Sequence, residues 1–199
     1  MSSLTKSIAL AAACAAAAFA PTSAWASDAQ GNFTLRGYGS RSCGTYLAEM
    51  SDPGHANNYA SWLMGYATAR NRLQSETFDI LPFPEGTVLF DAVSAVCRDQ
   101  QAITVEAAAN EVIRAIAPLH QRSASAVVTI DRGEQSVRIR QAALAALQAR
   151  LAELGLYSGP ADGEWREELT ASLTEFQLRE KIVASGLPDL PTLIRALVL

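Results

Sequence analysis

Few residues in this chain can carry out catalytic or metal chemistry. There are three cysteines, two histidines and only two lysines, Lys6 and Lys181. His55 and His120 lie far apart with no His-Glu-x-x-His spacing, so a two-histidine zinc site has no support. No Ser-x-x-Lys precedes Lys181, and no pair of carboxylates stands out as a general acid and base. The sequence therefore predicts a protein that is not an enzyme and uses no metal or cofactor.

The first 26 residues contain the three parts of a secretory signal peptide. Lys6 supplies the positive start, Ile8 to Ala20 is apolar, and Ala24-Trp25-Ala26 is a small-residue cleavage site. About 13 apolar residues are too few to cross a hydrocarbon core of about 30 Å. Cys14 leaves open a lipoprotein, in which this cysteine is acylated and retained. We expect residues 1–26 to be removed, which gives an exported protein with no membrane segment.

Two cysteines remain after this removal, Cys43 and Cys97. In an oxidising compartment an isolated pair most simply forms a disulfide. Closing a loop of about 55 residues would remove roughly 4 kcal/mol of unfolded-chain entropy. The alternative is a catalytic thiol, but neither cysteine has a histidine near it in the sequence. We therefore predict a Cys43–Cys97 disulfide in an N-terminal domain that spans residues 27–117.

Helical periodicity surrounds the two cysteines. Apolar residues recur at helical spacing in four segments, residues 41–50, 57–73, 88–97 and 105–116. The prolines of Phe78–Pro84 predict a loop between the second and third helices. Gly65 lies inside the second helix and costs about 1 kcal/mol relative to alanine, so we expect another backbone to approach it closely. The pattern predicts a four-helix domain stapled by the disulfide.

Several of these residues form a pattern typical of small exported bacterial proteins. They are Cys43-Gly44, Tyr46-Leu47, Trp62, Gly65-Tyr66, Asn71 and Cys97. Through this pattern, residues 39–116 resemble the Hde-type acid-stress chaperones and similar immunity-type periplasmic proteins. The resemblance implies a periplasmic, four-helix, disulfide-bridged domain that binds other proteins and has no catalytic residues.

The helical pattern stops between residues 118 and 136, where we place the domain boundary. Ala126–Ile130 and Val137–Ile139 are rich in β-branched residues and flank the turn sequence Asp131-Arg132-Gly133. These residues fit a short β-hairpin. They fit a flexible linker equally well, and the sequence leaves both alternatives open.

Residues 137–199 predict a second and smaller helical domain. Leucines recur at helical spacing after Arg140, and Gly155 is placed to end this helix in the left-handed conformation. We expect a second helix at residues 167–183 and a third that begins near Asp189, a good N-cap residue. Three short helices over about 60 residues form a minimal core. The predicted fold class is therefore all-α, with two domains.

A second pattern covers nearly all of this smaller domain. Its members are Leu147-Gln148, Leu154-Gly155, Tyr157, Gly159-Pro160, Asp162-Gly163, Trp165, Phe176-Gln177, Thr192-Leu193 and Leu197. With these positions in register, residues 141–198 resemble the peptidoglycan-binding-like domain appended to many bacterial wall enzymes. The resemblance implies a three-helix fold and peptidoglycan as the ligand. Two positions depart from the family pattern, because Arg166 and Leu169 replace its usual glycine and threonine.

Five residues are candidate ligand contacts. Peptidoglycan offers sugar faces with C–H groups, amides and stem-peptide carboxylates. A ring such as Tyr157 or Trp165 can cover a sugar face. Arg166 and Gln177 can hydrogen-bond amides or a carboxylate, and Asp162 lies in the same turn-rich stretch as the two rings.

Charge limits the remaining partners. The formal charge of the chain is −4, and loss of Lys6 makes it more negative, so non-specific capture of nucleic acid or anionic lipid is excluded. The sequence predicts an exported, non-catalytic protein that binds peptidoglycan and presents a helical protein-interaction domain at the cell wall. The alternative is a periplasmic acid-stress chaperone, or an immunity-type inhibitor of a wall hydrolase, whose C-terminal domain is only structural.

Overall fold

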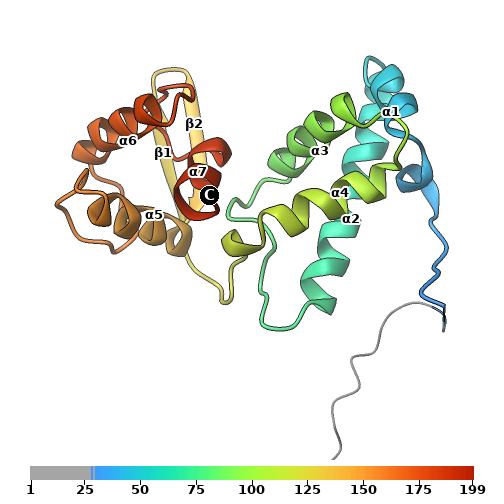
Figure 1. Cartoon of the computed structure of the whole chain (residues 1–199), viewed down its shortest axis with the longest axis horizontal. Helices are drawn as coiled ribbons and strands as arrows, with labels where there is room; N and C mark the ends of the chain where they lie inside the picture. Colours follow the sequence, from blue (N-terminus) through green and yellow to red (C-terminus); the bar gives the residue numbers. More distant parts are fainter. Residues whose placement is uncertain (1–27, 29) are drawn as a thin grey trace, which may run out of the picture. The chain divides into compact units, whose positions relative to one another are not determined.

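Seven α-helices and one two-stranded sheet make up the described chain (Figure 1). The computed structural model describes residues 28 and 30–199, so the predicted signal peptide at residues 1–26, with Cys14, lies outside the described residues. The helices are α1 (Cys43–Glu49), α2 (Pro53–Leu73), α3 (Thr87–Asp99), α4 (Val105–Ala115), α5 (Gln141–Glu153), α6 (Glu167–Arg179) and α7 (Leu190–Leu197). Short 3-10 helices, η1 (Gly37–Ser40) and η2 (Ala117–Leu119), precede α1 and follow α4. The prediction of a mainly helical fold is confirmed, with a small sheet added.

Side-chain caps decide where several helices begin. Ser42 accepts a hydrogen bond from the Thr45 N–H at 3.1 Å at the start of α1. Asp52 accepts one from the His55 N–H at 2.9 Å, and Pro53 occupies the first position of α2. Proline suits this position because its missing N–H has no partner to lose there. The predicted start of the second helix at residue 57 is therefore wrong: Asp52-Pro53-Gly54 begins α2.

The predicted disulfide is confirmed and joins the start of α1 to α3. Cys43 and Cys97 are bonded and both are fully buried. Tyr46 and Tyr59 pack edge to face beside them, with ring centroids 4.8 Å apart, and both side chains are also fully buried. Aromatic pairs favour this geometry. The first three helices thus share a core of one covalent bridge and edge-to-face aromatic rings.

Two glycines in this region behave differently. A Cβ atom at Gly39 would lie 2.0 Å from the Trp62 ring, so only glycine fits there. A Cβ atom at Gly65 would meet nothing within 4 Å. The expectation that another backbone approaches Gly65 is wrong, because this residue is on the exposed side of α2.

Strands β1 (Val127–Arg132) and β2 (Gln135–Arg140) form an antiparallel hairpin. Gly133 has a φ of +60°, which the first position of a tight two-residue turn requires. Ile130 and Ile139 are buried on one face of the hairpin. Of the two alternatives left open by the sequence, the structure has the hairpin, and it extends beyond residue 136 to Arg140.

The loop between α2 and α3 meets the end of the hairpin. The Arg140 Nη2 atom lies 2.6 Å from Asp79 Oδ2, and both side chains are only 14% exposed. The Arg140 N–H also donates to the Pro82 carbonyl at 2.9 Å. Removal of either charged partner would leave the other buried and unpaired. Residues 35–199 form one compact unit with a continuous core, and the proposed division at residues 118–136 stays a prediction.

Helices α5 and α6 end through local backbone geometry. Gly155 has a φ of +71°, and the Leu156 N–H bonds back to the Leu151 carbonyl at 2.8 Å. This is the C-terminal cap that the sequence predicted. The same arrangement ends α6 at Arg179, where Lys181 has a φ of +57°. The predicted extension of this helix to Val183 is wrong because Lys181 adopts the left-handed conformation without being glycine.

No helix in residues 28 and 30–199 combines the length and the apolar character needed to cross a bilayer.

Candidate functional site

The segment between α5 and α6 contains four of the five predicted ligand contacts. It is held to α5 by Gln148, whose side chain is fully buried. The Gln148 Oε1 atom accepts from the Gly163 N–H at 2.7 Å, and its Nε2 atom donates to the Glu164 carbonyl at 2.8 Å. Gly163 has a φ of +75°, and a Cβ atom there would lie 2.2 Å from the Gln141 carbonyl oxygen. The glycine of the Asp162-Gly163 pair is therefore a steric requirement of this turn.

Asp162 and Arg166 form a two-pronged ion pair at the surface of the turn. Arg166 Nη1 lies 2.8 Å from Asp162 Oδ1, and Nη2 lies 2.7 Å from Oδ2. Asp162 Oδ1 also accepts from the Glu164 N–H at 2.9 Å. The Arg166 guanidinium holds the pKa of the Asp162 carboxyl far below its usual range, chiefly through these hydrogen bonds. The site thus carries fixed charges of both signs at neutral pH.

The two departures from the family pattern fit this geometry. Arg166 has a φ of −136°, an extended conformation open to any residue, so a glycine is not required. Leu169 is fully buried in the core of the domain. The segment therefore keeps its turn without the usual glycine and threonine.

The two predicted rings have different exposure. Tyr157 is 6% exposed, and its ring lies against Gly159, where a Cβ atom would be 2.3 Å from the Tyr157 hydroxyl oxygen. Trp165 is half-buried and packs on the core from one side. Tyr157 supports the turn from within, whereas part of the Trp165 ring is available to a ligand.

Gln177 lies apart from the other four candidates, in α6. Its side chain is fully buried. Its Oε1 atom accepts from the Gly186 N–H at 2.7 Å, while Nε2 donates to the Leu187 carbonyl at 2.9 Å and to Thr192 Oγ1 at 2.8 Å. Gln148 and Gln177 therefore make the same arrangement, in which a buried carboxamide bonds a left-handed glycine N–H and the next carbonyl. We call each of these arrangements a glutamine clamp.

The structure thus pairs Asp162 with Arg166 at the surface, places the half-buried Trp165 next to Arg166 in the chain, and uses Gln177 inside. A ligand role for each of the five residues stays a prediction. Gln148 was part of the sequence pattern, but its function as a clamp was missed. The signal that could have found it is a glutamine among core leucines, since a buried amide needs specific partners.

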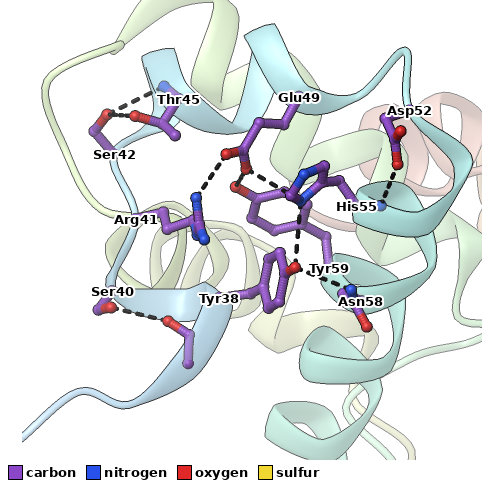
Figure 2. Close-up of polar contacts among 11 residues, drawn as sticks. Tyr38, Ser40, Arg41, Ser42, Thr45, Glu49, Asp52, His55, Asn58 and Tyr59 are labelled. Carbon is purple, nitrogen blue, oxygen red and sulfur yellow. Dashed lines mark hydrogen bonds and ion pairs between the residues drawn. The ribbon is translucent and has the colours of Figure 1, made fainter.

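Sequence reasoning also missed a polar cluster where η1, α1 and α2 meet (Figure 2). The Glu49 carboxylate accepts from Arg41 Nη1 at 2.6 Å and from the Tyr59 hydroxyl at 2.7 Å. The Tyr38 hydroxyl accepts from Asn58 Nδ2 at 2.9 Å. Burial, followed by the Glu49 carboxylate, raises the pKa of Tyr59 well above its usual range. Tyr59 therefore stays a neutral hydrogen-bond donor.

His55 joins this cluster from the first turn of α2. Its Nδ1 atom lies 3.2 Å from the Tyr38 hydroxyl and 3.7 Å from Glu49 Oε2. In a hydrolytic triad the histidine uses a different ring nitrogen for each partner. Because both partners here meet the same nitrogen, the cluster lacks the geometry of a proton relay. We interpret it as a structural network that ties η1 to α1 and α2.

Residues 28 and 30–199 contain no group of three or more His, Cys, Asp or Glu side chains placed to hold an ion.

Comparison with known proteins identifies one region. Residues 140–195 match the model of a family described as a putative peptidoglycan binding domain. No curated protein and no solved structure gives a significant match to the chain. The match includes the α5–α6 segment, both glutamine clamps and most of α7. The resemblance of residues 140–195 to a peptidoglycan-binding domain is therefore supported, and that family is a binding family rather than a catalytic one.

Proposed function

We propose that this chain is an exported, non-catalytic bacterial protein that binds peptidoglycan through residues 137–199. It presents residues 27–117 as a disulfide-stapled helical domain of the Hde type, which contacts periplasmic proteins at the wall. The observation that carries this proposal is the family match at residues 140–195. The signal-like sequence of residues 1–26 supports export, because peptidoglycan lies outside the cytoplasm.

The surface formed by Asp162, Trp165 and Arg166 is the proposed contact with the polymer. The half-buried Trp165 ring offers an apolar face for the C–H groups of a sugar. Arg166 has five N–H donors, and its pair with Asp162 uses two of them. The Arg166 side chain is 27% exposed, which leaves the guanidinium accessible from solvent.

The charges around Arg166 determine which chemical groups of peptidoglycan the site can bind. Asp162 neutralises Arg166, and Glu164 Oε2 lies 3.2 Å from Arg166 Nη2. A ligand carboxylate would therefore meet two carboxylates beside one guanidinium. Amide carbonyls and sugar hydroxyls avoid this repulsion, and Asp162 can accept from such hydroxyls. We propose that the site binds neutral sugar and amide groups rather than stem-peptide carboxylates.

Sedimentation with insoluble murein sacculi tests the proposal. The wild-type chain without residues 1–26 is expected in the pellet, and Trp165→Ala is expected to shift largely to the supernatant. The matched control is Leu178→Ala, since Leu178 is 64% exposed on the same helix that follows Trp165. Recovery of the wild type entirely in the supernatant would overturn the proposal. Release of soluble muropeptides by the protein alone would also contradict it, because that result requires a hydrolase.

A further inference from the structure

A groove of about 630 Å³ lies between α3, α4 and the start of α7. Its large apolar side chains are Val88, Val96, Val112, Ile116, Leu190 and Ile194. Ala92, Ala95 and Ala115 lie among them and leave room for bulky groups of a ligand. This volume is in the usual range for ligand pockets, of about 300–1,000 Å³.

The charged residues of the groove are all acidic. Asp91 comes from α3, Glu111 from α4, and Asp189 precedes α7, whereas no Lys, Arg or His lines the groove. Asp91 and Glu111 are exposed. Within residues 28 and 30–199, none of these three carboxylates forms an ion pair with a basic side chain at 4.0 Å or less (the nine such contacts are elsewhere). The groove therefore combines an apolar floor with carboxylates that have no basic partner; Asp189 also accepts from the Thr192 N–H as the cap of α7.

The groove continues into a neighbouring hollow. It shares Val88, Asp189 and Leu190 with an adjoining hollow of about 330 Å³ beside the hairpin. The adjoining hollow contains Glu85 and Arg138, which already pair with each other at 2.5 Å. An elongated occupant can thus run from the α3–α4 surface toward β2 without meeting an unpaired cation.

Peptidoglycan does not match this surface, because it is hydrophilic and its stem peptides carry carboxylates that the acidic rim repels. A cationic amphipathic helix matches both properties. Its apolar face would fill the groove, and its Lys or Arg side chains would reach Asp91, Glu111 and Asp189. We propose that the groove docks such a helix from a partner protein. This inference rests on the proposed function, since it gives the protein-presenting role a surface and a partner chemistry.

The test uses a synthetic helical peptide of about 14 residues, with leucines on one face and lysines on the other. Fluorescence anisotropy measures its binding to the chain without residues 1–26, in the absence of murein, at about 50 mM and 300 mM salt. Two control peptides have the same composition in scrambled order, or glutamate in place of lysine. We expect binding of the leucine–lysine helix only, and weaker binding at the higher salt concentration.

Two variants locate the binding. Ala95→Trp fills the groove from an exposed position, and the double variant Asp91→Lys, Glu111→Lys reverses the rim charge. Each is expected to weaken peptide binding by about tenfold or more. Ala171→Trp, at an exposed site on α6 outside the groove, is the control and is expected to bind normally. Circular dichroism checks that each variant is folded.

Equal binding by wild type and both groove variants would overturn the inference, as would binding of the glutamate peptide. A dimer that Ala95→Trp dissociates would also overturn it, because the occupant would then be a second copy of this chain. The same variants are sedimented with murein sacculi. Absence of peptide binding by the wild type, with normal sedimentation, would overturn the groove inference alone, whereas failure of the wild type to sediment would overturn the proposed function.

Discussion

The two ends of this chain are stabilised by different chemistry. Helices α1 and α3 are joined by a buried disulfide, and the same core contains aromatic rings packed edge to face. Helices α5, α6 and α7 contain no cysteine, and two buried glutamines hold the loops that connect them. The disulfide depends on an oxidising environment, whereas the loops between α5, α6 and α7 depend on complete hydrogen bonding of buried amides. Residues 137–199 therefore fix the turn that carries the candidate site with buried side-chain hydrogen bonds and without a covalent bridge.

Loss of the disulfide has the largest expected effect. The double variant Cys43→Ala, Cys97→Ala restores the entropy of a loop of about 55 residues and should lower the free energy of unfolding by about 4 kcal/mol. Denaturant unfolding measures this loss. Hydrogen exchange should show that α1 and α3 lose protection before α5 and α6. Equal loss of protection in all four helices would contradict separate stabilisation of the two regions, because both would then unfold as one.

Loss of a glutamine clamp has the next largest expected effect on stability. Gln148→Leu and Gln177→Leu each keep the volume of the side chain but leave a buried glycine N–H and a carbonyl without partners. Unsatisfied buried groups of this kind should cost roughly 2–4 kcal/mol in each variant. Thermal and denaturant unfolding measure the loss. Gln135→Leu, at an exposed position of the hairpin, is the control and should change stability little. A neutral Gln148→Leu would contradict the clamp.

Substitutions at Gly39 and Gly65 have smaller expected effects, and the two effects have opposite signs. Gly39→Ala forces the Trp62 ring to move and should cost about 1–3 kcal/mol. Gly65→Ala meets open space on an exposed helix surface and should stabilise the protein by about 1 kcal/mol. Denaturant midpoints of the two variants test this directly. Destabilisation by Gly65→Ala would contradict this account and would indicate that another backbone does lie close to Gly65.

The smallest expected effect is on the pH dependence of stability, which should differ between His120 and Asp162. Burial lowers the pKa of His120, which packs near α4 with Nε2 3.1 Å from the Ile113 carbonyl oxygen. The unfolded chain then binds the proton more readily, so this contribution to stability is present above about pH 6.5 and is lost as pH falls below it. The lowered pKa of Asp162 gives a contribution that is present above about pH 4 and is lost as pH falls further.

Unfolding from pH 8 to about pH 3 tests these windows with two variants that do not titrate, His120→Asn and Asp162→Asn. The stability difference from wild type should begin to change near pH 6.5 for His120→Asn and only below about pH 5 for Asp162→Asn. Coincident onsets would contradict the assignment of separate windows.

Much of the helical architecture follows from local signals in the sequence. Asp189 and Gly155 act as the predicted caps, and the disulfide forms between the two cysteines that remain after residue 26. The errors also have local causes. The second helix was predicted to begin at residue 57, although Pro53 suits the first turn of a helix, and Lys181 takes the left-handed conformation that favours glycine.

The candidate site was less predictable because its geometry is long-range. The pattern identified Asp162, Trp165 and Arg166 as neighbours in sequence, and Asp162 pairs with Arg166 at the surface. It did not reveal that Gln148 and Gln177 face inward, because their glycine partners come later in the chain and belong to other elements. The polar cluster around Glu49 was missed for the same reason, since no spacing connects residues from η1, α1 and α2.

Heteronuclear NMR of the isotope-labelled chain without residues 1–26, titrated with soluble disaccharide-peptide fragments of murein, tests the central claim most directly. The account predicts saturable shifts of the Trp165 indole N–H, the Arg166 side chain and the backbone amides of Asp162–Arg166, with the amides around Glu49 unchanged. Shifts that cluster around Glu49, or no saturable shift in the α5–α6 segment at millimolar fragment, would contradict peptidoglycan binding by this turn.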